Sequence, residues 1–355
     1  LLARLNEQKI GNTEVLLFCR HMYTLLKAGV PIMGALKGLQ ESTENKAFSR
    51  VVQDLRENLD SGHELSVCLT RHPRVFDPFY VAMVRVGELT GTLEEVFLRL
   101  FNHLEFEQFM RDQVKSAIRY PAFVVTAMAM AIVIINIFVI PAFAKIYQGF
   151  KTELPLMTKM LIGFSNFMVA WWPVMLAALA AAVYGFHLWK TTPRGRLAWD
   201  EFKMKIPVAG PIVLKATLAR FSRSFALAIR SGVPAVQALT MVANTVDNVY
   251  VARRIEAMRE GVERGESVLK TAVATGIFTP IVLQMVAVGE ETGALDDLMS
   301  EIADMYQREV EYDLKSLASQ IEPILIVVLG ALVLILALGV FLPIWDLGSA
   351  ALGKK

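Results

Sequence analysis

The sequence is poor in charged residues and in cysteine. Charged residues make up 20% of its 355 residues and the formal net charge is +2, whereas an ordinary soluble domain carries about 25% charged residues. Binding to a phosphate backbone needs a clustered basic face, so we exclude a nucleic-acid partner. Cys19 and Cys68 have no CxxC or zinc-ligand spacing, and we expect small buried thiols in a reducing compartment.

Motifs of catalysis are also missing. The sequence has no GxxxxGK[ST] run and no GxGxxG after a strand, so it offers no phosphate cradle for nucleotide hydrolysis. It has no GxSxG elbow for a serine nucleophile, and the histidines show neither HExxH nor another metal-ligand spacing. The five histidines are His21, His63, His72, His103 and His187. We therefore predict no enzyme, no cofactor and no metal, and any energy must come from another protein.

Long apolar runs are what the sequence has in abundance. Hydrophobic residues make up 54% of the chain and the mean hydropathy is +0.45. The runs 122–140, 169–189 and 324–342 are each long enough to cross most of a ~30 Å hydrocarbon core at ~1.5 Å per residue. We predict three transmembrane helices, with Pro121 and Pro323 as the membrane-entry prolines of the first and third.

The distribution of Lys and Arg predicts the orientation. These residues gather between positions 190 and 215 and just before the first span, whereas the loop after that span has few, so the two rich flanks are cytoplasmic. The predicted segments are a cytoplasmic repeat at 1–121, a periplasmic loop at 141–168, a second cytoplasmic repeat at 190–323 and a short periplasmic tail at 343–355.

The chain contains an internal repeat. The elements Phe18-Cys19-Arg20 and Gly29-Val30-Pro31 recur 203 positions later as Phe221-Ser222-Arg223 and Gly232-Val233-Pro234. MVRVGELTGTLEEV at 83–96 matches MVAVGEETGALDDL at 285–298 at eight of fourteen positions. The match continues to the entry prolines, so the duplicated unit is a helical bundle plus its following transmembrane helix. The middle span, which has no counterpart, returns the chain to the same side, and we expect two-fold related faces for a common partner.

The hydrophobic spacing predicts an all-α fold with about six helices in each copy. We expect Thr13 to cap the first helix, and Gly-Val-Pro to form a tight helical hairpin in both copies. The other predicted helices are 46–60, 64–71, 78–88 and 92–119 in the first copy, and 217–231, 235–245, 248–264, 266–274, 280–290 and 294–320 in the second.

A repeated acidic turn has two interpretations. Gly87-Glu88 with Gly91 and two later acids recurs as Gly289-Glu290 with Gly293 and Asp296-Asp297. Such carboxylates could bind a divalent cation or a basic partner surface. Alternatively the later acids lie in the first turn of a helix, with Thr92 and Glu95 forming a capping box. Capping leaves Glu88 and Glu290 unexplained.

Several motifs together resemble one family. They are the two acidic turns, the GVP hairpins, YPAF at 120–123, LPLMT at 154–158 and FLPIWDLGS at 341–349. The chain resembles the type II secretion F-domain family, the inner-membrane platform proteins of type II secretion systems and type IV pili, and its end is most similar to the branch that serves mannose-sensitive haemagglutinin pili. Family members usually carry more sequence before the region that begins here with Leu1, so we expect a further N-terminal segment.

The resemblance implies a set of partners. They are a hexameric cytoplasmic assembly ATPase, pilin or pseudopilin subunits, other inner-membrane assembly proteins, membrane lipid and a second copy of the chain in a dimer. The predicted function is an assembly platform that couples the ATPase to insertion of subunits into the fibre, with an acidic contact at Glu88 or Glu290. The rival functions are a membrane-bound hydrolase and a small-molecule or ion transporter with duplicated regulatory domains, for which the spans offer few polar groups.

The sequence singles out twelve residues as partner-contact or structural-motif candidates. They are Arg20, Gly29, Pro31, Gly87, Glu88, Gly91, Arg223, Gly232, Pro234, Gly289, Glu290 and Gly293.

Overall fold

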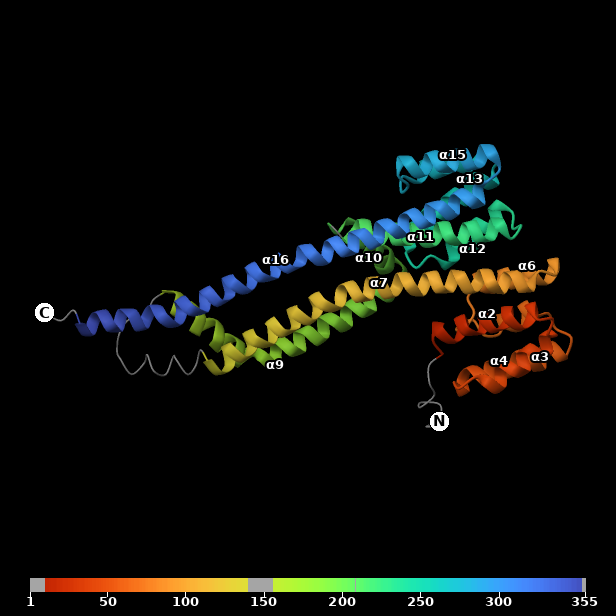
Figure 1. Cartoon of the computed structure of the whole chain (residues 1–355). Helices are drawn as coiled ribbons and strands as arrows, with labels where there is room; N and C mark the ends of the chain where they lie inside the picture. Colours follow the sequence, from red (N-terminus) through yellow and green to blue (C-terminus); the bar gives the residue numbers. More distant parts are fainter. Residues whose placement is uncertain (1–9, 140–155, 208, 353–355) are drawn as a thin grey trace. The chain divides into compact units, whose positions relative to one another are not determined.

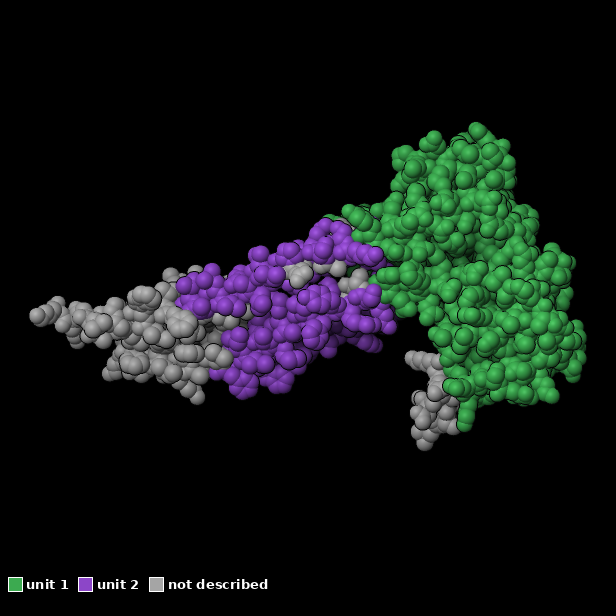
Figure 2. All heavy atoms as spheres, in the orientation of Figure 1, with its two compact units in different colours: residues 1–113, 197–312 green, residues 114–196, 313–355 purple. Residues whose placement is uncertain are grey.

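The residues that form regular structure are all helical in the described part of the chain. The computed structural model describes residues 10–139, 156–207 and 209–352, and these ranges contain helices and no strand, which confirms the predicted all-α class. The first part of the predicted loop 141–168 and the last residues of the predicted tail 343–355 lie outside the described residues. The chain divides into two compact units, residues 1–113 with 197–312 and residues 114–196 with 313–355 (Figure 2).

Unit 1 contains both copies of the repeat. Copy 1 consists of α2 to α6 and of α7 up to Gln113, and copy 2 consists of α11 to α15 and of α16 up to Tyr312. The helices of copy 1 are α2 Asn12–Lys27, α3 Ile32–Ser42, α4 Lys46–Asp60, α5 Leu65–Thr70, α6 Pro78–Thr90 and α7 Leu93–Ile134. Those of copy 2 are α11 Ala209–Arg230, α12 Ala235–Thr245, α13 Val249–Glu263, α14 Val268–Thr275, α15 Pro280–Thr292 and α16 Leu295–Leu352, with α10 Pro193–Lys205 before them. The two predicted six-helix repeats are confirmed.

The first helix begins differently from the prediction. α2 starts at Asn12, so Thr13 lies inside the helix and the prediction that it caps the helix is wrong. The Gly11 N–H instead donates to the carboxylate of Glu14 at 2.8 Å, and the other oxygen of Glu14 accepts from Asn45 at 2.8 Å. A carboxylate that binds both a helix start and a second helix satisfies orphan backbone donors while fixing tertiary structure.

The Gly-Val-Pro hairpin is present in both copies. Gly29 and Gly232 have φ angles of 78° and 84°, a left-handed conformation that costs little only for glycine. The following valines donate back into the helix, Val30 to Leu25 at 3.0 Å and Val233 to Ala228 at 3.1 Å, as expected for a glycine that ends a helix. Pro31 and Pro234 then stand directly before α3 and α12.

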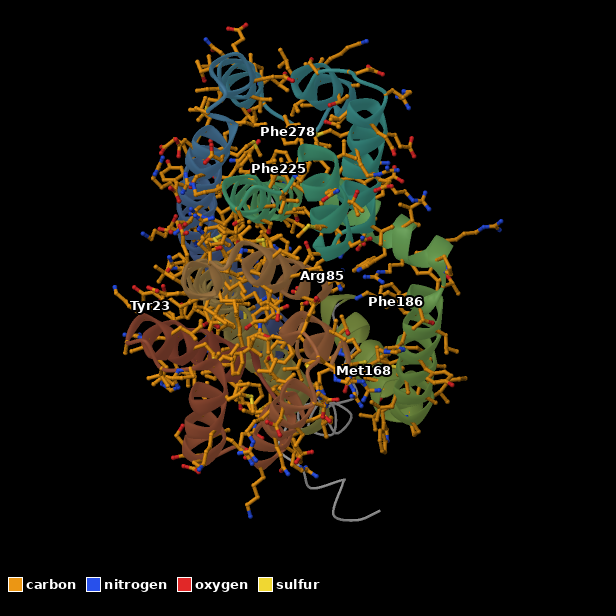
Figure 3. The ribbon with its side chains drawn as sticks, turned by 90° about the vertical axis from the view of Figure 1, so that its right-hand side faces the viewer. Tyr23, Arg85, Met168, Phe186, Phe225 and Phe278 are labelled. Carbon is orange, nitrogen blue, oxygen red and sulfur yellow. The ribbon has the colours of Figure 1, made fainter. Side chains whose placement is uncertain are left out.

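The aromatic core is also repeated. Phe18, 1% exposed, packs its ring 5.8 Å from that of Phe76. Phe221 in copy 2 is fully buried, and its ring lies 5.9 Å from that of Phe278, the residue equivalent to Phe76. Figure 3 labels Phe278 within copy 2. Each copy thus fixes its first long helix to the loop that precedes α6 or α15.

The two copies pack head to tail. α6 of copy 1 contacts α12 of copy 2. The helices equivalent to these two are α15 and α3, and they lie at opposite ends of unit 1, with α6, α7, α11 and α12 between them (Figures 1 and 3). A two-fold axis would bring α3 against α15, so the expectation of two-fold related faces is wrong. The α6 surface has become an internal contact surface, whereas its α15 counterpart has not.

Unit 2 consists of apolar helices. It contains the remainders of α7 and α16, the π-helix η1 Ile135–Val139 and the whole of α9 Leu156–Thr191. Three helices are long and apolar enough to cross a membrane, Leu93–Ile134, Ser165–Thr191 and Leu295–Ala331. Large apolar side chains are exposed on these helices, among them Phe123 at 72%. Surfaces of this kind are typical of lipid contact, and the three predicted apolar helices are confirmed.

The entry prolines do not end helices. The sequence predicts helices 92–119 and 294–320 that stop before Pro121 and Pro323, but α7 and α16 continue through both positions. An internal proline removes one backbone hydrogen bond, yet apolar helices at a membrane tolerate this loss because neighbouring groups satisfy the freed carbonyl. The predicted segment boundaries at 121 and 323 stay predictions.

Candidate functional site: the glutamate turns and the junction of the copies

Glu88 lies near the end of α6 and binds the start of another helix. One carboxylate oxygen accepts from the backbone N–H of Leu65, and the other accepts from that of Ser66 at 2.9 Å. These are the first two residues of α5, whose N–H groups have no partner within their own helix. The carboxylate therefore caps α5 from a different helix and places negative charge at its positive end.

Glu290 makes the same contact in copy 2. Its carboxylate oxygens accept from the N–H groups of Val268 at 2.7 Å and Leu269 at 3.0 Å, which open α14. We call each arrangement a carboxylate clasp, formed by Glu88 with α5 or by Glu290 with α14. The clasps give a structural role to Glu88 and Glu290, which capping of the following helix did not. Since both oxygens of each carboxylate are already bound to backbone donors, we do not place the partner contact there.

Glycines shape the turn beside each clasp. A Cβ atom on Gly87 would lie 2.9 Å from a methyl carbon of Val96, and one on Gly289 would lie 3.1 Å from the Cα of Leu295. These two glycines therefore let α6 and α15 approach the helix that follows them. Gly91 and Gly293, with φ angles of 70° and 74°, end the same two helices in the left-handed conformation.

The later acids of the motif bind arginines. The predicted capping box of Thr92 and Glu95 is wrong, because the Thr92 hydroxyl pairs with that of Thr90 at 2.7 Å and the Glu95 carboxylate pairs with Arg99. In copy 2, Arg230 of α11 binds Asp297 and also donates its Nε to Asp296 at 3.1 Å. Within the described residues no group of three or more His, Cys, Asp and Glu side chains could hold a metal.

The two matching arginines of the repeat have different surroundings. Arg20 is exposed, with its guanidinium carbon 5.5 Å from the ring centre of Phe101. Arg223 donates to Ser300 at 3.2 Å and to Asp304, and its guanidinium carbon lies 4.7 Å from the ring centre of Phe106. Phe106 belongs to copy 1, so Arg223 joins the copies by a cation–π contact.

Two further arginine contacts cross the junction. Arg99 of copy 1 donates to the Ser231 hydroxyl of copy 2 at 2.8 Å. Arg111 of copy 1 and Arg220 of copy 2 share Asp247, at 4.0 and 2.7 Å. Sequence reasoning missed all of these residues, because each contact joins positions more than 100 residues apart or depends on how the copies face each other.

His103 is buried in this junction. It is 6% exposed, lies beside Phe79 with the ring centres 5.1 Å apart, and helps to line a cavity of about 450 Å³ together with Arg223. Burial lowers the pKa of His103; the nearby Arg223 and Arg220 act in the same direction, whereas Glu107 and Asp77 oppose them. The ring is therefore held neutral at neutral pH.

We expect acidification to loosen copy 1 through His103. The unfolded chain takes up a proton near the ordinary histidine pKa of 6.5, whereas folded His103 protonates only at lower pH. Unfolding is therefore favoured as pH falls below 6.5, by at most about 1.4 kcal/mol per pH unit. Thermal unfolding midpoints of the detergent-solubilised chain at pH 7.5 and 5.5 measure this.

The matched comparison is between His103→Asn and His21→Asn. His21 is exposed in the same copy, so the thermal unfolding midpoint of His21→Asn should fall between pH 7.5 and 5.5 as much as that of the wild type. The midpoint of His103→Asn should fall less. Burial raises the pKa of Asp77, so this residue stabilises the folded chain as pH falls and opposes the effect of His103. Asp77 is present in every variant and does not affect the comparison. An unchanged slope in His103→Asn would contradict the prediction.

The comparison with known proteins finds the same duplication. Residues 18–141 and 221–343 each match the family described as Type II secretion system (T2SS), protein F. The chain belongs to this family. The two matched segments correspond to the two copies with their following apolar helices, so the repeat inferred from the sequence is the family's own unit.

Relatives are similar over nearly the whole chain. The type IV pilus assembly protein TapC of Aeromonas hydrophila is 33% identical over 96% of this chain and 83% of its own length. The type IV pilus assembly protein PilC of Thermus thermophilus is 36% identical over 96% and 84%. The type II secretion system protein F of Pseudomonas aeruginosa is 29% identical over 95% and 83%. Relatives named for pilus assembly and a relative named for secretion are thus similar to this chain over almost the same length.

Proposed function

We propose that this chain is a non-enzymatic inner-membrane platform for a type IV pilus or a type II secretion pseudopilus. Its family and the names of its relatives, which are pilus assembly and secretion proteins, support this function. Three apolar helices able to cross a membrane support a multi-pass location. The buried Asn45 and Asn248 cap the starts of α4 and α13, a structural role that fits a platform.

The packing of the copies against each other is the observation that carries the proposed topology. Contacts such as Arg99 to Ser231 and the α6–α12 packing join copy 1 to copy 2 directly, which supports a location of both copies on the same side of the membrane. The Lys and Arg of the flanking segments support the cytoplasm as that side. There a hexameric assembly ATPase can engage the two copies as one body, while the apolar helices receive the hydrophobic segments of pilin or pseudopilin subunits.

Cysteine labelling tests the topology. Ser61 lies at the end of α4 in copy 1 and Arg264 at the end of α13 in copy 2, and both are exposed. Ser61→Cys and Arg264→Cys should react with a membrane-impermeant maleimide in inverted inner-membrane vesicles and stay unlabelled in intact spheroplasts. Cys19 and Cys68 are buried and give little background. Labelling of the two positions from opposite sides would overturn the topology.

Deletion and complementation test the function itself. Removing the chain should abolish surface pili or secretion, and restoring it should recover both, with the ATPase and fibre subunits co-purifying from native membranes. Normal fibre assembly and secretion in the deletion strain would refute the platform. The transporter hypothesis makes a separate prediction, namely substrate flux in proteoliposomes that contain only this chain, and we expect none.

A further inference from the structure

In the head-to-tail packing, each copy uses one of the two surfaces that can form the contact and leaves the other free. α6 of copy 1 binds α12 of copy 2, but α3, the counterpart of α12, and α15, the counterpart of α6, lie at opposite ends of unit 1 (Figures 1 and 3). A contact between different surfaces of two similar bodies is heterologous, and it can be repeated by a further body at each free end.

The existing contact shows which residues of α6 and α12 face a common cavity. Val86 and Leu89 of α6 and Thr240 and Met241 of α12 line one cavity of about 600 Å³ between the copies, and Figure 3 labels Arg85, which lines it too. By the repeat alignment, the counterparts of Val86 and Leu89 are Val288 and Glu291 on α15. The counterparts of Thr240 and Met241 are Lys37 and Gly38 on α3.

These counterparts form two open surfaces. On α3, Gly34, Lys37 and Gly38 are exposed, and a Cβ atom on Gly38 would meet nothing within 4 Å. On α15, Val288 is 46% exposed and Glu291 is exposed. A helix face flattened by glycines therefore stands at one end of unit 1, and a face that carries an exposed valine and an exposed glutamate stands at the other.

The charges of the two faces are complementary. Lys37 takes the place of Thr240 and Glu291 takes the place of Leu89, so an α3–α15 contact with the same geometry as the α12–α6 contact would place a lysine and a glutamate on the lining of one shared cavity. Neither residue has an ion-pair partner in the part of the chain that the structure describes, although both are exposed. Opposite charges across a contact favour one register and disfavour the alternatives.

We propose that α3 of one chain binds α15 of a second copy in the way that α12 binds α6 within the chain. The occupant of each open face is therefore another molecule of this protein, and the contact extends the internal one from copy to copy. The contact rests on unit 1 alone and does not depend on the proposed function, since it needs neither ATPase nor fibre subunit.

Crosslinking between two tagged chains tests the contact. Gly38→Cys in one full-length chain and Val288→Cys in a differently tagged one should be joined by a short bismaleimide in membranes when the two are co-expressed. Either variant alone should give little product, because a head-to-tail contact brings α3 to α15 and not to itself. Crosslinking of Gly38→Cys with itself at equal yield would overturn the proposal, as would no product from the pair.

A charge reversal supplies the second readout. Lys37→Glu alone and Glu291→Lys alone should each lower the crosslink yield about threefold or more, and combining both in every chain should restore it. Ser61→Cys paired with Val288→Cys, which places the thiol at the end of α4 and not on α3, is the negative control. Lowered yields that the double reversal does not restore would contradict the predicted register, and circular dichroism confirms that each variant is folded. Piliation assays are not needed, so failure here leaves the platform function untouched.

Discussion

Glu88→Gln and Glu290→Gln are each expected to weaken one carboxylate clasp by about 1.5–3 kcal/mol, since hydrogen bonds to a charged group contribute about that much. The amide oxygen of glutamine can accept one backbone N–H, but its NH₂ group faces the second donor and leaves it unsatisfied. Amide exchange should accelerate roughly 10- to 100-fold in α5 for the first variant and in α14 for the second.

Hydrogen-exchange mass spectrometry of the full chain in detergent measures the two copies separately. Because the clasps are in different copies, the effect of each variant should stay within its own copy. Glu260→Gln is the matched control, since this glutamate of α13 is exposed and forms no clasp. If Glu290→Gln left exchange in α14 unchanged but reduced co-purification of the ATPase, the glutamate would be a partner contact and the structural assignment would be wrong.

Phe18→Ala is expected to cost about 3–5 kcal/mol, the range for removing a buried phenylalanine from a packed core. Its ring touches three others that come from separate parts of copy 1, Phe48, Phe76 and Phe97, at centre distances of 5.9, 5.8 and 6.0 Å. The cavity therefore opens at the meeting point of α2, α4 and α7, where little collapse is possible. Exchange should accelerate throughout copy 1, by about a hundredfold or more.

Leu17→Ala provides the control for this effect. Leu17 is adjacent in the sequence but 44% exposed, so its loss should cost well under 1 kcal/mol. Phe221→Ala should repeat the large effect in copy 2, where the Phe221 ring contacts those of Phe225 and Phe278. Equal exchange in the Phe18 and Leu17 variants would show that the aromatic cluster does not hold copy 1 together.

Much of this fold follows from local sequence patterns. The helical spacing, the glycine that ends a helix and the proline that precedes the next are properties of short segments, so the helices of both copies and the Gly-Val-Pro hairpins were predictable. The three apolar helices were predictable for the same reason, because a run of some twenty apolar residues has few alternatives. Helix ends were less predictable, because α7 and α16 continue through Pro121 and Pro323 although a proline favours the end of a helix.

The contacts of the candidate site were not predictable in this way. Glu88 meets α5 some 22 residues away, and nothing in either segment alone reveals that an acid at one helix end caps another. The duplicated sequence did offer a signal, since Glu88 and Glu290 are retained where neighbouring residues differ. The head-to-tail arrangement of the copies was inaccessible, because a repeat specifies similar bodies and not how they face each other.

The carboxylate clasp holds its helix in the same way in both copies, although the segments that follow the two helices differ in length. In copy 1 the residues 71–77 join α5 to α6, whereas in copy 2 only 276–279 join α14 to α15, yet the same glutamate grips the same helix start in both. The clasp therefore sets the position of α5 or α14, while Phe76 or Phe278 holds the connecting segment to the aromatic core. An insertion between the exposed Pro73 and Arg74 should leave both α5 and Phe76 in place, which makes this point a site where the protein can acquire an added sequence without remodelling its bundle.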